Sequence, residues 1–316
     1  MTAIANAYRQ FVVKPIERRS AALFVLQIAQ LLHDRARGRL DSSIQHVIRM
    51  MRPKVSLPKA KFMNESAIAE SAATLRQRGW DILPWRLDAD SIAELRRFAF
   101  TTPAYANNPG ERIAVTESNI PRDHGRYIWR MSELIRVPAV QRLISDGTFH
   151  RLAQEYIGCR PTITSISLWL DPVYEGTYDA HIYHYDNDGP SFLKFFIYLS
   201  DVDTESGAHT FIQGTHTRQK PWQFGRSGRY DRDKLLDFFG RENEINFTGP
   251  AGTILAEDTA GFHKGTTPKK NCRLLLQLQY AMLDIPHEEE FEGALEKVSV
   301  DGLDPGIKQV ARKFFV

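Results

Sequence analysis

The run Arg273–Leu283 alternates between two kinds of side chain along its length. Successive side chains of a β-strand point to opposite faces, so residues two apart share a face. One face is apolar and predicts burial in a core: Leu274, Leu276, Leu278 and Tyr280. The other face carries an arginine, a leucine and two amides: Arg273, Leu275, Gln277 and Gln279. The alternation predicts a strand whose polar face either meets solvent or lines the interior of a barrel.

The rest of the pattern predicts helices mainly in the first half of the chain and strands in the second. Helices are predicted over 41–52, 64–78, 90–100, 128–145 and 147–157, with a short strand over 82–85 and a loop over 101–126. Strands are predicted over 162–170, 178–186, 192–199, 208–213, 252–256, 261–263 and 273–283. Their number and spacing predict a mainly β, cupin-like jelly roll with helices packed on one sheet.

Three side chains in the strand-rich half are candidate metal ligands. His184 and Asp186 share a strand face, because Tyr185 between them points away. His263 lies far downstream, between Gly261-Phe262 and a polar turn, and supplies a third ligand of the right type. Two histidines and one carboxylate on one face leave about half of an octahedral shell open, as non-haem Fe(II) requires when it binds a co-substrate and O₂. We therefore predict His184, Asp186 and His263 as metal-binding and catalytic residues.

Two basic residues in predicted strands are candidates for binding a co-substrate. Arg273 follows His263 by ten residues, and its planar guanidinium group suits bidentate binding of a carboxylate. Lys194 shares a strand face with Phe196 and Tyr198. If that face lines the barrel, Lys194 contacts co-substrate or substrate; the alternative is a strand-edge lysine in solvent. Ser165, Ser167 and Trp169 alternate in the same way and either line the pocket or pack.

Taken in order, these residues resemble the phytanoyl-CoA dioxygenase family of Fe(II)/2-oxoglutarate oxygenases. The resemblance spans about 67–286 and includes these motifs: His184-x-Asp186, Leu199–Ala208, Gly214-Thr215-His216, His263 and Arg273. It implies a double-stranded β-helix, iron bound by the three ligands above, and 2-oxoglutarate anchored by Arg273. The family often has a hydroxyl residue two positions after the distal histidine, where this chain has Gly265. Thr266 or Thr267 is the predicted replacement.

Charge divides the chain unevenly. Residues 1–61 hold twelve Lys or Arg and three Asp or Glu, a net charge of +9, so the rest of the chain carries −6 of the total of +3. We predict a basic helical appendage over 1–61 and a dioxygenase domain over 62–316. The appendage contains an apolar run, Ala21–Leu32, and a helical stripe of Ile44, Val47, Ile48 and Met51. It predicts either an amphipathic element on an anionic membrane surface or helices packed on the barrel. Nucleic acid is not an expected partner, because aromatic residues are not interleaved with the basic ones.

The predicted function follows from these observations. We expect an Fe(II)- and 2-oxoglutarate-dependent dioxygenase that uses O₂ to hydroxylate an unactivated carbon, and Asp186 favours hydroxylation over halogenation. The predicted substrate is an anionic lipid-linked sugar, such as Kdo of lipid A, reached beneath a basic, aromatic insertion over Arg218–Arg241. Alternatives are a soluble natural-product or acyl-thioester hydroxylase and a cupin-like binding protein without turnover. Two cysteines in 316 residues and no membrane-spanning run predict a cytoplasmic protein, peripheral at the inner face of the membrane if the appendage binds lipid.

Overall fold

Two facing β-sheets form the centre of the protein. The computed structural model describes residues 41–106, 111–176, 178–217, 219–224, 228–283 and 297–315. In these residues an eight-stranded sheet has the order β1-β9-β6-β11-β5-β4-β2-β3, and a three-stranded sheet has the order β10-β7-β8. The strands are β1 Trp80–Ile82, β2 Ala104–Ala106, β3 Arg112–Ile113, β4 Tyr127–Trp129, β5 Thr162–Asp171, β6 Phe192–Tyr198, β7 His209–Ile212, β8 Glu244–Phe247, β9 Ile254–Glu257, β10 His263–Gly265 and β11 Arg273–Ala281. All ladders are antiparallel.

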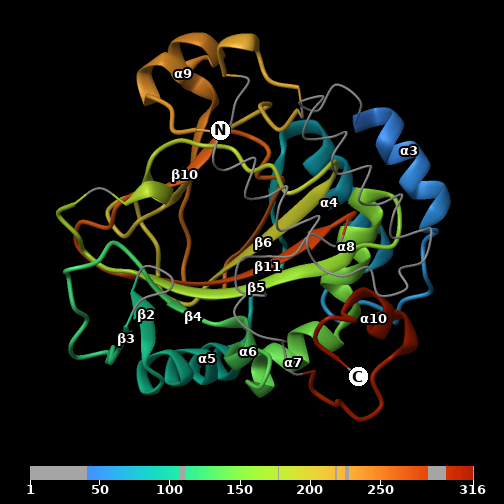
Figure 1. Ribbon diagram of the computed structural model, residues 1–316, viewed down its shortest axis with the longest axis horizontal. Coiled ribbons are helices and arrows are strands. Elements are labelled where there is room, and N and C mark those ends of the chain that lie inside the picture. Colours follow the sequence, from blue (N-terminus) through green and yellow to red (C-terminus); the bar gives the residue numbers. More distant parts are fainter. Residues whose placement is uncertain are drawn as a thin grey trace, which may run out of the picture.

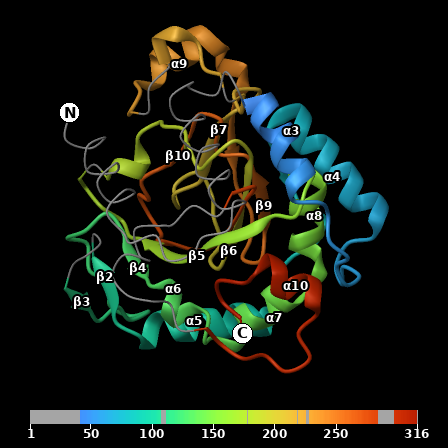
Figure 2. The same ribbon diagram turned by 45° about the vertical axis from the view of Figure 1, so that its right-hand side comes forward.

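The predicted jelly-roll fold is confirmed as a double-stranded β-helix. Strands β9, β6, β11 and β5 form the large wall, and β10, β7 and β8 form the small one (Figures 1 and 2). An isolated bridge between His184 and His263 extends the small sheet by one position. The segment before Asp186 is therefore held by backbone hydrogen bonds to the neighbourhood of β10.

Helices flank both sheets. They are α3 Asp41–Met51, α4 Glu65–Arg78, α5 Ala89–Thr101, α6 Met131–Leu134, α7 Pro138–Ser145, α8 Gly147–Ile157, α9 Arg232–Phe239 and α10 Pro305–Val310. Figure 1 shows α3, α4 and α8 together beside the long strands, whereas α9 stands apart near β10. In α4, Ile68, Ala72 and Leu75 recur at helical spacing and are buried, which is why this face packs inward.

Burial of β11 decides between the two readings of its polar face. All nine residues of the strand are buried, so neither face meets solvent. Leu274, Leu276 and Leu278 belong to the main core beneath the helices. Leu275 belongs to a separate cluster between the sheets, which includes Phe196 and Phe247 from facing walls. The face that carries Arg273 therefore lines the barrel interior.

Several predicted elements differ from the observed ones. The predicted strand over 178–186 forms a 3-10 turn, η1 Asp179–His181, followed by single bridges at Tyr183 and His184. The predicted helix over 128–145 is divided into β4, α6 and α7, because Pro138 starts a new helix at its N1 position. The predicted loop over 101–126 contains β2 and β3, and α9 and β8 were not predicted. These short elements are set by pairing with distant strands, which local propensity does not encode.

The described part of the predicted appendage packs against the barrel domain. Ile44 and Ile48 of α3 are buried in the main core. Arg52 donates hydrogen bonds to the Met282 carbonyl at 2.7 Å and to Thr162 Oγ1 at 2.7 Å. Residues 1–40, with the apolar run 21–32, lie outside the described residues, and the boundary at residue 61 stays a prediction. Among the described helices, none is long and apolar enough to cross a membrane.

Candidate metal and co-substrate site

The three predicted metal ligands come together inside the barrel. His184, Asp186 and His263 each offer a ligand atom, and these atoms lie within 4.8 Å of one another. Nε2 of His184 lies 3.9 Å from Asp186 Oδ1, and Nε2 of His263 lies 3.5 Å from Asp186 Oδ2. Backbone hydrogen bonds hold the set: His184 and His263 bond each other in both directions, and the Asp186 N–H donates to the Thr259 carbonyl at 2.8 Å.

Both histidine rings are oriented by their Nδ1 atoms. Nδ1 of His184 lies 2.8 Å from the Ile182 carbonyl oxygen, and Nδ1 of His263 lies 3.0 Å from the Gly261 carbonyl oxygen. A carbonyl only accepts, so Nδ1 carries the proton and Nε2 keeps its lone pair. Burial lowers the pKa of both imidazoles, which favours this neutral form. The two rings therefore present unprotonated nitrogens to the space beside Asp186.

Lys194 contacts the predicted carboxylate ligand directly. Its Nζ donates to Asp186 Oδ2 at 2.6 Å and lies 3.0 Å from Asp188 Oδ2. Burial disfavours the charged form of Asp186, but Lys194 and the two histidines outweigh it and lower the pKa of this carboxyl. Lys194 is buried, which rules out the strand-edge lysine in solvent. Its contact with a co-substrate stays a prediction.

Arg273 lies at another end of the interior and is fully buried. The antiparallel ladder pairs Arg273 of β11 with Asp171 of β5, so their side chains share a face. Nη2 of Arg273 donates to Asp171 Oδ2 at 2.6 Å. Asp171 also accepts from Arg126 Nε at 2.6 Å and from Arg126 Nη2 at 3.1 Å. Neither Asp171 nor Arg126 was singled out from the sequence, although the strand register makes Asp171 the neighbour of Arg273.

Several hydrogen-bonding atoms near Arg273 are buried without a partner. They are Arg273 Nε and Nη1, Trp169 Nε1 and His181 Nε2. The arginine and indole atoms are donors, and buried donors without partners are rare in native proteins. A carboxylate is an acceptor of the right charge for the N–H groups of Arg273 Nη1. The residues present therefore fit the distal carboxylate of 2-oxoglutarate.

Steric crowding accounts for a glycine, Gly265, at the position where the family often has a hydroxyl residue. A Cβ atom on Gly265 would lie 2.7 Å from Arg273 Nη2 and 3.3 Å from His181 Cδ2. A serine or threonine at residue 265 would therefore crowd the guanidinium group. Thr266, the predicted replacement, donates its hydroxyl to the Ala208 carbonyl at 2.9 Å, and its role stays a prediction. Thr267 lies near Arg273, because its Oγ1 lies 3.0 Å from Nδ1 of His181, which is beside Arg273.

A second buried acid lies close to the metal site and was missed by the sequence reasoning. Nε2 of His209 lies 3.1 and 2.9 Å from the two carboxyl oxygens of Glu257. Burial raises the pKa of Glu257 and lowers that of His209, so the pair is expected to be uncharged. The His209 and His263 rings are stacked at 5.4 Å. Glu257 comes beside Lys194 only through the pairing of β9 with β6, which no local sequence pattern indicates.

The interior wall beside these residues is polar as well as aromatic. Gln277 of β11 pairs with Ser167 of β5, and Gln279 pairs with Ser165. Ser165 Oγ and Ser167 Oγ lie 3.1 Å apart. These side chains share the inward face of Arg273, and whether they line a substrate pocket or only pack stays a prediction.

The insertion between β7 and β8 packs on the segment that carries the metal ligands. The Tyr230 N–H donates to the Tyr183 carbonyl at 2.8 Å. Its described arginines already have partners: Arg229 pairs with Asp179, and Arg232 pairs with Glu244. The described part of the insertion therefore carries less unpaired positive charge than its composition predicts. Its role as a lid stays a prediction.

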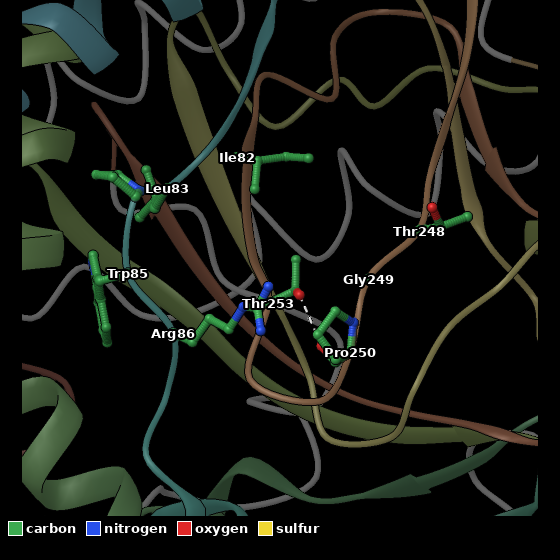
Figure 3. Close-up of a pocket in the computed structure, with 9 residues that line it drawn as sticks. Ile82, Leu83, Trp85, Arg86, Thr248, Gly249, Pro250 and Thr253 are labelled. Atoms are coloured by element: carbon green, nitrogen blue, oxygen red, sulfur yellow. Dashed lines mark hydrogen bonds between the residues drawn. The ribbon is translucent and has the colours of Figure 1, made fainter.

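A pocket occurs near the edge of the large sheet, away from the predicted site residues. It is lined by Ile82, Leu83, Pro84, Trp85, Arg86, Thr248, Gly249, Pro250 and Thr253 (Figure 3). Thr253 Oγ1 donates to the Pro250 carbonyl across its floor at 2.8 Å. None of the metal or co-substrate candidates lines this pocket, so we do not place the active site there.

Comparisons with known proteins establish the fold. No family model and no curated protein matches the sequence. The structure is similar to the epimerase SnoN in complex with Fe³⁺, alpha ketoglutarate and nogalamycin RO, with TM-score 0.52, 18% identity, and coverage of 69% of this chain and 84% of that chain. It is also similar to EctD from S. alaskensis with bound Fe, with TM-score 0.49, 19% identity, and coverage of 74% and 86%. At 18% identity, the likeness to SnoN supports the double-stranded β-helix and no finer statement.

Proposed function

We propose that the protein is an Fe(II)- and 2-oxoglutarate-dependent dioxygenase that hydroxylates an unactivated carbon. The observation that carries the proposal is the convergence of His184, Asp186 and His263, with both Nε2 atoms facing one carboxylate. Two neutral imidazoles and a carboxylate on one side suit iron that must keep open positions. Bound iron, 2-oxoglutarate and O₂ supply the oxidising chemistry, giving hydroxylated product, succinate and CO₂.

The chain's own residues have distinct tasks in this proposal. His184 and His263 bind iron through Nε2 while their Nδ1–H groups donate to carbonyls that fix the rings. Lys194 orients Asp186 through a charge-assisted hydrogen bond. Arg273 binds the distal carboxylate of 2-oxoglutarate through Nη1, which has no hydrogen-bond partner among the described residues. The buried interior excludes water from the reacting carbon.

For the substrate, the proposal is an anionic lipid-linked sugar such as Kdo of lipid A. Hydroxyl and amide side chains on the inward wall, among them Ser165, Ser167 and Gln277, suit a polyhydroxylated ligand. Trp222 on the insertion is 91% exposed and supports contact with an amphiphile. The combination of the candidate iron site, the basic segment 1–61 and the basic insertion resembles the bacterial hydroxylase of Kdo. The paired arginines of the insertion supply little of the support, which rests mainly on the basic segment.

The protein is also proposed to bind an anionic membrane surface through its N-terminal residues. The charge of +9 over 1–61 supports this, as do Val47, Met50 and Met51 of α3, which remain exposed beside the buried face. The rival substrates are soluble natural products and acyl thioesters. The rival of a different class is a cupin-like binding protein, which has no need of a carboxylate-binding arginine beside its metal site.

Release of succinate tests the proposal. Purified protein with Fe(II) and 2-oxoglutarate should release succinate when supplied with a membrane extract or purified lipid A carrying Kdo, and hydroxylated sugar should appear in equal amount. Soluble natural products and acyl thioesters form the comparison set. Iron binding without any 2-oxoglutarate consumption would instead favour the non-catalytic binding protein.

A further inference from the structure

Three charged side chains form a buried cluster at the Arg273 end of the barrel. The side chains of Arg126, Asp171 and Arg273 are 9%, 0% and 1% exposed. Two guanidinium groups share one carboxylate, so the cluster holds one net positive charge. His181 beside it adds none, since burial lowers its pKa and favours the neutral form. A buried charge is costly unless an ion of opposite sign pairs with it.

The two arginines make unequal hydrogen bonds to the Asp171 carboxylate. Arg126 donates to both oxygens of Asp171, from Nε at 2.6 Å and from Nη2 at 3.1 Å. Arg273 donates to Asp171 through Nη2 alone, at 2.6 Å. Among the described residues, no acceptor forms a hydrogen bond of good geometry with its Nε or Nη1. Arg126 thus takes the bidentate position that Arg273 would otherwise occupy.

Strand pairing and aromatic rings hold Arg126 in this position. Tyr127 of β4 pairs with Leu170 of β5, so Arg126 comes beside Asp171 at the next position of the ladder. The guanidinium carbon of Arg126 lies 4.3 Å from the Trp169 ring centroid and 5.0 Å from that of Tyr178. Arginine over an aromatic face is attracted to it and loses orientational freedom.

We infer that Arg126 is a positioning and charge-balancing residue of the 2-oxoglutarate site. By neutralising Asp171 through a bidentate pair, it leaves Arg273 with an unneutralised charge and with Nη1 available to donate to the distal carboxylate of 2-oxoglutarate. The inference deepens the proposed function and rests on it. Arg126 acts through Asp171 and Arg273 and does not itself contact the co-substrate.

The test measures binding of 2-oxoglutarate by calorimetry to protein loaded with Mn(II), which avoids turnover. In Arg126→Gln the freed Asp171 pairs bidentately with Arg273, and the cluster becomes neutral. The Kd for 2-oxoglutarate should then rise about tenfold or more, because a charge-assisted hydrogen bond is lost. The Kd for 2-oxopentanoate, which has a methyl group in place of the distal carboxylate, should stay unchanged.

The double variant R126Q/D171N separates charge balance from simple structural damage. It restores one net positive charge on Arg273, so its affinity for 2-oxoglutarate should recover most of what R126Q loses. If Arg126 had only a structural role, the order would be the opposite, and the double variant would bind 2-oxoglutarate more weakly than R126Q. Arg52→Gln is the matched control, since Arg52 is equally buried but bonds Met282 and Thr162 outside the site.

The outcomes distinguish this inference from the proposed function. Wild-type protein that binds metal but not 2-oxoglutarate contradicts the proposed function itself. Wild-type binding with an unchanged Kd in R126Q, or a double variant weaker than R126Q, overturns the role of Arg126. If circular dichroism shows that R126Q is unfolded, the double variant R126Q/D171N becomes the deciding test, because it removes the buried pair as a unit. Wild-type-like binding of 2-oxoglutarate by the double variant supports the inference, and lost binding overturns it.

Discussion

Asp186 supplies the negative charge between the two site histidines, and it is also bonded to Lys194. We predict that Asp186→Ala weakens Fe(II) binding by more than about 100-fold, since even residues that only support a metal ligand contribute 10–100-fold. Hydroxylation should be lost, whereas the fold should remain, because Lys194 keeps Asp188 as a partner at 3.0 Å.

The matched control for this prediction is Asp188→Ala. It removes a carboxylate two residues away that contacts Lys194 but lies outside the three-ligand group. Metal titration should separate the two variants clearly. Wild-type-like turnover by Asp186→Ala would show that the metal assignment is wrong.

Arg273 is the residue on which recognition of 2-oxoglutarate depends. We predict that Arg273→Leu raises the KM for 2-oxoglutarate at least about 30-fold, because losing one partner of a buried charge pair costs roughly 2–5 kcal/mol. Fe(II) affinity should stay the same, since Arg273 is not in the metal group. The fold should tolerate the change, because Asp171 keeps its bidentate pair with Arg126. An unchanged KM would indicate that another residue, Lys194 first, anchors the co-substrate.

At the scale of elements, α3 belongs to the packed body of the domain. Ile48 is completely buried and Ile44 is 7% exposed, whereas Met50 on the same helix is 66% exposed. Ile48→Ala should lower the free energy of unfolding by about 2–5 kcal/mol, because it deletes buried methyl groups and leaves a cavity. Met50→Ala should change it by less than about 0.5 kcal/mol. Chemical denaturation of both variants checks this, and equal, small effects would mean that α3 is not part of the core in solution.

The free charge of the insertion between β7 and β8 depends on partners from other segments. Its composition is basic and aromatic, yet its described arginines pair with nearby carboxylates such as Asp179 and Glu244. Tyr230 joins it to the segment before His184 through the Tyr183 carbonyl. Charge counted along a sequence is therefore a poor guide to free charge on an element, since folding brings acidic partners from other segments.

For the whole molecule, we predict membrane association through residues 1–40 together with the exposed stripe of α3. Each basic side chain near an anionic surface contributes about 1 kcal/mol, and salt weakens that attraction. The full chain should sediment with anionic vesicles and be released only in part by high salt, because buried apolar side chains add a salt-resistant component.

The deletion that tests this association should begin at Asp41. A deletion to residue 61 would also remove Ile48 and Arg52 and damage the core. The protein lacking residues 1–40 should remain in the supernatant, and neutral vesicles serve as the control surface. If the full chain also stays in the supernatant, the case for a lipid-linked substrate loses its main support.

Local order in the chain was sufficient to predict the main architecture. Alternation along 273–283 follows from strand geometry, which depends only on neighbouring residues. The long helices α4 and α8 were predicted for the same reason, since helical periodicity is local.

The remaining features depend on contacts between segments far apart in the chain. Whether the polar face of β11 meets solvent or the interior is set by the second sheet, and the role of Asp171 is set by its register with Arg273. Long-range contacts also determine three other features: the pairing of Glu257 with His209, the hydrogen bonds from Arg126 to Asp171 and the packing of α3. Each joins residues that are dozens of positions apart, and no periodicity within one segment encodes which distant partner will satisfy a buried charge.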